Sequence, residues 1–62
     1  MEINNNNLID FIMDYESGQL SDEKTIELFQ FLVNNGMAWT LQGHYGRMAK
    51  RLIEAGLINA KN

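Results

Sequence analysis

The chain has 62 residues, a formal net charge of -3 at pH 7, and neither cysteine nor proline. A chain this short forms one domain, near the lower size limit for independent folding. Without cysteine, it has no disulfide, no thiolate metal ligand and no cysteine nucleophile. No apolar run approaches the roughly 20 residues of a membrane span. Residues 1–7 lack the basic and apolar segments of a secretory signal, so we expect an intracellular protein without a membrane partner.

The charge is distributed unevenly along the chain. Residues 1–30 carry seven acidic residues against Lys24, whereas residues 31–62 carry four basic residues against Glu54. The two halves can pair inside the fold or face different partners, and the sequence leaves both alternatives open. The overall acidity argues against general nucleic-acid binding, which needs a net basic surface.

The first predicted helix spans residues 8–17 and follows a flexible tail, residues 1–7. Asn7 is the expected N-cap, because an asparagine side chain accepts hydrogen bonds from the first amides of a helix. Apolar residues recur at helical spacing from Leu8 to Tyr15. Gly18 follows where a residue in the left-handed conformation ends many helices.

The second predicted helix begins after Ser21, whose hydroxyl is a capping oxygen, with Asp22 and Glu23 at the positive end of the helix dipole. Its apolar residues are Ile26, Leu28, Phe29, Phe31, Leu32 and Val33. An apolar face this wide predicts contacts with neighbours on two sides. Gly36 ends the helix, and Met37 is expected to fold back onto it in a Schellman motif.

The third predicted element spans about residues 38–55 and ends at Gly56, with Leu57 folding back onto Leu52. One helical face carries Leu41, Tyr45, Met48 and Leu52. Gly43 and Gly46 each cost about 1 kcal/mol in a helix interior relative to alanine. Two interpretations therefore remain open: a continuous helix, or a short turn over residues 38–42 followed by a helix from about residue 44.

Together these elements predict an all-α fold: a compact three-helix domain over residues 8–58, without strands, followed by a frayed end at residues 59–62. Short glycine-containing turns predict antiparallel neighbouring helices. Trp39 is expected to fill the core beneath the three helices, because small folds depend on buried aromatic residues.

The segment from Gly43 to Gly46 has the spacing G-x-x-G. In one interpretation the backbone approaches a phosphate, as in the nucleotide-clamping loop of KH domains. Such a domain needs a sheet, and no strand pattern flanks this segment. We favour the structural interpretation, in which the missing side chains let another helix or Trp39 pack closely.

The candidate partner-binding residues gather around the third helix: Gln42, His44, Tyr45, Arg47, Lys50 and Arg51. Arginine suits bidentate contacts with carboxylates and phosphates. Tyr45 and Gln42 are expected to expose polar groups beside the basic residues. The structural alternative is a solvated basic face that pairs with acids of the first helix, such as Asp10 or Asp14.

We predict no catalytic residue, no metal site and no cofactor. His44 lacks a nucleophile and an orienting group, and the two serines are explained by helix boundaries. The carboxylates Asp14, Glu16, Asp22 and Glu23 lack the spacing of a calcium-binding loop.

The chain resembles a group of very small uncharacterised proteins of tailed bacteriophages. The resemblance depends on the core W-x-L-Q-G-x-Y-G-R over residues 39–47 and on matching positions within residues 28–36 and 49–56. Phe31 departs from the pattern, where a polar residue is expected, and so predicts an additional exposed contact. The resemblance implies a phage origin and the cytoplasm of the infected bacterial host, but it supplies no activity.

We therefore predict a non-catalytic accessory protein that binds a host or phage protein, or a second copy of itself, through the surface of residues 42–51. The step from small phage proteins to this role is analogy. The alternative is a nucleic-acid-binding module that uses the basic third helix and the G-x-x-G segment.

Overall fold

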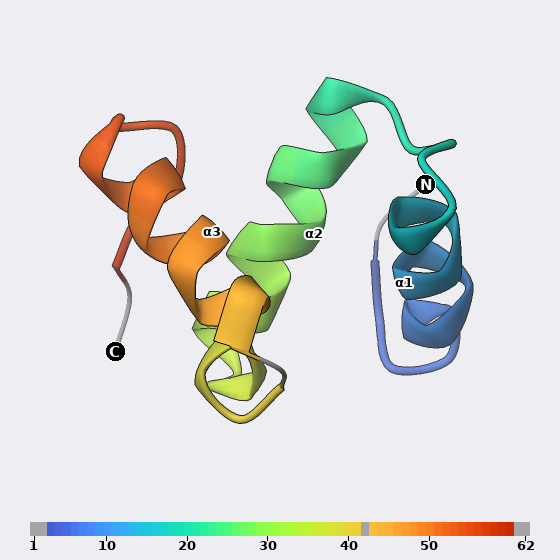
Figure 1. The fold of residues 1–62 in the computed structure, drawn as a ribbon. Coiled ribbons are helices and arrows are strands. Elements are labelled where there is room, and N and C mark those ends of the chain that lie inside the picture. Colours follow the sequence, from blue (N-terminus) through green and yellow to red (C-terminus); the bar gives the residue numbers. More distant parts are fainter. Residues whose placement is uncertain (1–2, 42, 61–62) are drawn as a thin grey trace.

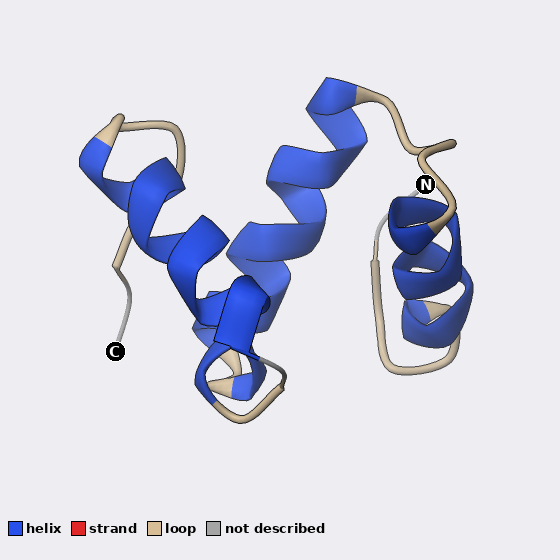
Figure 2. Ribbon diagram, in the orientation of Figure 1, coloured by secondary structure: helices blue, strands red, loops and turns tan. Residues whose placement is uncertain are grey.

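The computed structural model describes residues 3–41 and 43–60. Its elements follow in the order α1 (Leu8–Glu16), α2 (Asp22–Asn34), the short 3₁₀ helix η1 (Met37–Trp39) and α3 (Gly43–Glu54). The described residues contain no strand, so the prediction of an all-α three-helix domain is confirmed (Figure 2). The radius of gyration is 10.6 Å, which matches the value of about 10.6 Å expected for a compact chain of this length.

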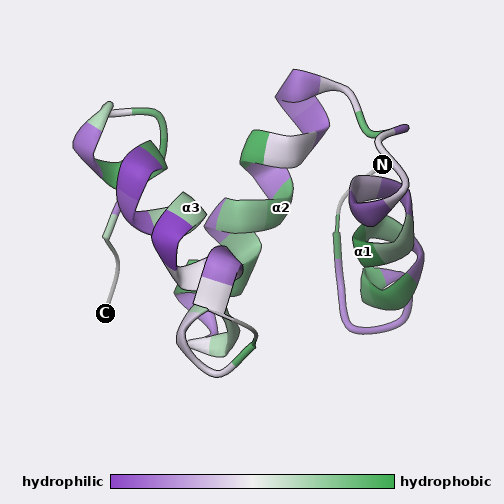
Figure 3. Ribbon diagram, viewed as in Figure 1, coloured by the Kyte–Doolittle hydropathy of each residue, from purple (hydrophilic) through white to green (hydrophobic). Residues whose placement is uncertain are grey.

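Helix α2 forms the centre of the fold, between α1 and α3 (Figure 1). Its residues Leu28, Phe29 and Leu32 have no exposed surface. Most hydrophobic residues of α2 lie in the half that leads into η1, whereas its first turn is hydrophilic (Figure 3). Helix α2 contacts α1 on one side and α3 on the other, so the predicted contacts on two sides are confirmed. Phe31, for which we expected an exposed contact, is half-buried and packs against the core.

The two predicted N-caps differ in outcome. Ser21 Oγ accepts a hydrogen bond from the Lys24 N–H at 3.2 Å, so the cap of α2 is confirmed. Asn7 occupies the N-cap position of α1, as predicted, but the expected capping hydrogen bond of its side chain is absent. Its Oδ1 instead accepts from the Asn4 N–H at 2.8 Å, because the side chain closes the turn before the helix.

Glycines in the left-handed region end all three α-helices, as predicted: φ is 79° at Gly18, 82° at Gly36 and 78° at Gly56. After α3, the Leu57 N–H donates to the Leu52 carbonyl at 3.0 Å, which is the long hydrogen bond of a Schellman motif. The same pattern closes α1, which ends one residue earlier than predicted.

The end of α2 lacks the full Schellman motif that we predicted. The Gly36 N–H donates to the Val33 carbonyl at 3.1 Å, as the motif requires. The Met37 N–H instead donates to Asn35 Oδ1 at 2.9 Å. The prediction is wrong in this detail because a side chain, and not a helix carbonyl, accepts the second hydrogen bond.

After α3, the chain returns to the core through a different residue than predicted. Leu57 folds back onto Leu52 through its backbone, as predicted, but its side chain is 53% exposed and Ile58 is the buried residue. Beyond it, Asn59 and Gln30 exchange two hydrogen bonds, of 2.8 and 3.1 Å. These hydrogen bonds hold the segment that follows α3 against α2.

Parts of the predicted tails lie outside the described residues, namely residues 1–2 and 61–62. Within the described part, Ile3 packs against the core, and the backbone of Asn4 accepts a hydrogen bond from the Asn7 N–H at 3.2 Å.

The third element is broken, as one of the two interpretations predicted. Helix η1 ends at Trp39 and α3 begins at Gly43, so a continuous helix from residue 38 is wrong. Because the chain turns here, Ala38 and not Trp39 faces the core. Ala38 has no exposed surface, whereas Trp39 is 54% exposed. The expectation that Trp39 fills the core is therefore wrong.

Candidate functional site

Helix α3 has a buried face and a basic face. Tyr45 and Ala49 are buried on the side that contacts α2 and η1. The opposite side exposes Arg47, Lys50 and Arg51. We call these three residues the basic face. Their exposure follows from helical spacing, because the apolar positions of α3 turn toward α2.

Tyr45 belongs to the core. Its side chain is 2% exposed, so the expectation that it presents a polar group at the surface is wrong. Its hydroxyl donates a hydrogen bond of 2.6 Å to Glu16 Oε2 on α1. Burial raises the pKa of Tyr45 above the usual tyrosine value, and the hydrogen bond to Glu16 raises it further. The phenol is therefore a neutral donor at physiological pH, and it connects α3 to α1.

Aromatic side chains span the space between α1 and α3. Among the described residues, no Cα atom of α1 lies within 8 Å of a Cα atom of α3. The ring of Tyr15 is 6.3 Å from that of His44, at an interplanar angle of 14°, and 5.7 Å from that of Tyr45. The His44 and Tyr45 rings are 4.2 Å apart. These centroid distances are close to those of favourable aromatic pairs, so they fix the half-buried His44 beside α1.

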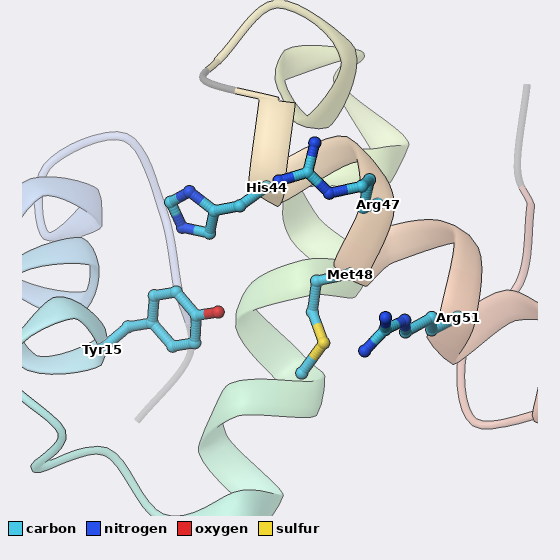
Figure 4. A pocket seen from close by; sticks show the side chains of 5 residues that line it. All are labelled: Tyr15, His44, Arg47, Met48 and Arg51. Atoms are coloured by element: carbon cyan, nitrogen blue, oxygen red, sulfur yellow. The ribbon is translucent and has the colours of Figure 1, made fainter.

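A partly open cavity of about 190 Å³ lies in this space. It is lined by Tyr15, His44, Arg47, Met48 and Arg51 (Figure 4). The Tyr15 hydroxyl and the Arg51 guanidinium point toward its centre near Met48, while the Arg47 guanidinium extends toward His44. We call this cavity the Arg47–Arg51 pocket.

The basic face has no carboxylate partner within the described part of the chain. The ion pair found there joins Lys24 Nζ to Glu27 Oε1 on α2, at 3.5 Å. The expected pairing of the third helix with Asp10 or Asp14 is therefore wrong for residues 3–41 and 43–60. The α1 carboxylate that reaches α3 is that of Glu16, and its hydrogen-bond partner is Tyr45 instead of a basic residue.

The two glycines of the G-x-x-G segment have different surroundings. A Cβ atom on Gly46 would lie 3.6 Å from Trp39 Cε3 and from the Ala38 carbonyl oxygen, which are ordinary contacts. The indole therefore lies over Gly46, as the packing interpretation predicted, yet with room for a methyl group. A Cβ on Gly43 would lie 3.2 Å from Nη1 of Arg47. Gly43 thus leaves space for the guanidinium.

The structure brings together only part of the predicted partner-binding set. His44, Arg47 and Arg51 line the pocket, and Lys50 is exposed beside them on the same helix. Tyr45 is buried, and Gln42 lies outside the described residues.

Sequence analysis missed two residues of the pocket. Met48 lies between the arginines in the sequence and four residues after His44, a spacing that places it on their side of the helix. Tyr15 lies in the pocket because α1 and α3 both pack on α2, and no local pattern reports that arrangement.

Within the described ranges, no three side chains of histidine, aspartate or glutamate come together in a way that could hold a metal ion. His44 has the rings of Tyr15 and Tyr45 as neighbours. No helix in that part of the chain has the length and apolar character needed to cross a membrane.

The comparison with protein families gives one match. The family described as "Domain of unknown function (DUF7417)" matches residues 4–62, which include every residue of the pocket and of the basic face. No curated protein and no solved structure matches the chain.

Proposed function

We propose that this chain, which belongs to the DUF7417 family of unknown function, is a non-catalytic module that binds another protein through the basic face of α3 and the adjoining pocket. The observation that carries the proposal is the exposure of three basic side chains with no carboxylate partner in the described part of the chain. Arginine is enriched where proteins bind one another, because it combines charge with a planar hydrogen-bonding group.

The position of Trp39 supports a protein partner. Its side chain is 54% exposed on η1, next to the start of α3. Tryptophan and arginine are the residues most enriched among those that dominate binding energies at interfaces. An exposed indole next to the helix that carries the unpaired arginines therefore provides an apolar anchor in addition to the charged ones.

The resemblance to tailed-phage proteins supports the biological setting that we propose. In that setting the chain is an accessory protein in the cytoplasm of an infected bacterium, and its partner is a host or phage protein. Self-association is the variant in which the partner is a second copy of the chain.

Affinity capture tests the proposal. The purified chain is immobilised and exposed to lysates of infected and uninfected bacteria, and captured proteins are identified by mass spectrometry. Arg47→Ala and Arg51→Ala should each lose a partner that the wild type retains. Lys24→Ala is the matched control, because it removes one positive charge from α2, away from the site. Equal recovery of every protein by all four chains would contradict the proposal.

Nucleic-acid binding is the second candidate function, favoured by the same exposed basic side chains on α3. It requires an affinity that falls steeply as salt rises, because bound phosphates release counterions. The acidic first half of the chain opposes it. A short duplex and a short single strand of DNA, and the same pair in RNA, should show no binding at low ionic strength if the protein-binding proposal is right.

A further inference from the structure

We infer that the Arg47–Arg51 pocket receives one acidic side chain, an aspartate or a glutamate, of the protein partner. This inference rests on the proposed function, and it adds the chemistry by which the partner is recognised. It is carried by the charge of the pocket walls, by the size of the pocket and by the position of the Arg47 guanidinium.

The charge of the pocket is positive and uncompensated. Arg47 and Arg51 stand four residues apart, so both project from one side of α3. No acidic residue lines the pocket, and neither arginine forms an ion pair within the described residues. A guanidinium presents parallel N–H donors that match the two oxygens of a carboxylate.

The size of the pocket suits a side chain. Its volume of about 190 Å³ is smaller than the ~300–1,000 Å³ of sites for free small molecules. Met48 and the ring of Tyr15 provide apolar surface for the methylene groups of an acidic residue, and methionine adapts readily to such contacts. The Tyr15 hydroxyl, which points to the centre, adds a hydrogen-bond donor (Figure 4).

Gly43 positions one of the two arginines. The Arg47 guanidinium folds back along α3, so that Nη1 lies 3.2 Å from where a Cβ on Gly43 would stand. That separation is tighter than ordinary contact, so a methyl group there would move the guanidinium. The first glycine of the G-x-x-G segment thus leaves room for the guanidinium to lie along the start of α3.

The surroundings of the pocket favour a carboxylate over a phosphate backbone. Tyr15 stands in the sequence between Asp14 and Glu16, and both acids are exposed. A nucleic-acid strand that crossed the pocket would bring consecutive phosphates toward these carboxylates. A single acidic side chain that enters from a partner meets the two arginines and no carboxylate among the residues that line the pocket.

Selection from a library of short random peptides tests the inference without a known partner. The targets are the wild type, the double variant Arg47→Gln/Arg51→Gln and the control Lys24→Gln. We expect the wild type and the control to enrich peptides that share an aspartate or glutamate. Replacing that acid by its amide should weaken binding at least about tenfold, because a hydrogen bond to a charged group is lost. The double variant should lose the same peptides.

The site of binding is then mapped by NMR with one enriched peptide. Its addition should shift the Met48 methyl and the Tyr15 ring signals, whereas its amide analogue should not. Gly43→Ala should weaken the peptide without lowering the melting temperature, which separates a displaced guanidinium from a damaged fold.

Three results of the peptide experiments would overturn the inference. The first is the absence of any enriched peptide, and the second is enrichment of peptides that share no acidic residue. The third is a short DNA strand that shifts the NMR signals of Met48 and Tyr15 and binds more tightly than the acidic peptide. The proposed function is tested separately from this inference. If lysate partners depend on Arg47 and Arg51 but tolerate replacement of their own acids by amides, the protein-binding module stands and the carboxylate pocket does not.

Discussion

The hydroxyl of Tyr45 on α3 lies 2.6 Å from Glu16 Oε2 on α1 and donates a hydrogen bond to it. This contact joins two helices whose described Cα atoms do not come within 8 Å of one another. Because Tyr45 is buried and Glu16 is exposed, the bond runs from the core to the surface of α1, next in the sequence to Tyr15 of the Arg47–Arg51 pocket. The packing of the core and the shape of the pocket are therefore linked.

Tyr45→Phe should lower stability moderately while it preserves the fold. The variant keeps the buried ring and loses one hydrogen bond, which contributes about 1 kcal/mol. A loss of that size lowers the melting temperature by about 4–8 °C in a domain of this length. Thermal melts followed by circular dichroism provide the measurement, with Tyr15→Phe as the control that removes a different hydroxyl. Identical melting of Tyr45→Phe and wild type would show that the bond contributes nothing.

The same phenol should make stability depend on alkaline pH. The folded-state pKa of Tyr45 is raised, so above about pH 10, where an unperturbed tyrosine ionises, the unfolded chain has lost a proton that the native chain keeps. The unfolded state then binds fewer protons than the native state, so the free energy of unfolding falls as pH rises. The stabilising contribution of the Tyr45 phenol is therefore complete below about pH 10 and is lost above it.

The magnitude of this effect is up to about 1.4 kcal/mol per pH unit for one proton. Melting temperatures measured across the alkaline range should therefore fall more steeply for the wild type than for Tyr45→Phe. Parallel curves for the two chains would contradict the raised pKa.

Two glycine substitutions should change stability in opposite directions. Gly46→Ala places a methyl group in ordinary contact with Trp39 and should stabilise α3 by up to about 1 kcal/mol, because alanine loses less backbone entropy. Gly36→Ala places an alanine at φ 82° and should cost about 1–2 kcal/mol. Denaturant titrations measure both. A destabilised Gly46→Ala would indicate closer packing of the indole than the structure has.

Trp39 should be accessible to solvent in the native protein. It is the only tryptophan in the chain and is 54% exposed, so intrinsic fluorescence reports this single position. Acrylamide should quench the native protein substantially, with only a moderate further increase after unfolding in guanidinium. Strong protection of the native fluorescence would instead place Trp39 in the core, as the sequence alone suggested.

Local signals in the sequence predicted most of the fold. A capping oxygen at Ser21 and left-handed glycines at positions 18, 36 and 56 act within a few residues, so their positions predicted the start of α2 and the C-terminal ends of the α-helices to within about one residue. The stripe that includes Tyr45 also indicated an inward-facing residue. We nevertheless predicted that Tyr45 lies on the partner-binding surface, because its hydroxyl is polar. Its position on the apolar face of the helix was the better indicator.

The remaining features depend on how the elements pack. The turn after Gly36 determines which residue of η1 faces the core. Ala38 lies there, although the larger side chain of Trp39 had been expected to fill the core. The pocket exists because α1 brings Tyr15 opposite α3, a contact between segments distant in the sequence. Helical periodicity describes one helix at a time and does not report such a meeting.

The central claim is that Arg47 and Arg51 bind a protein partner through their charge. Reversing that charge tests it most directly: recovery of captured partners is quantified for Arg47→Glu/Arg51→Glu, with Lys24→Glu as the control and circular dichroism to establish folding. We predict that the folded double variant loses the partner while Lys24→Glu retains it. Undiminished recovery by the folded double variant would contradict the claim.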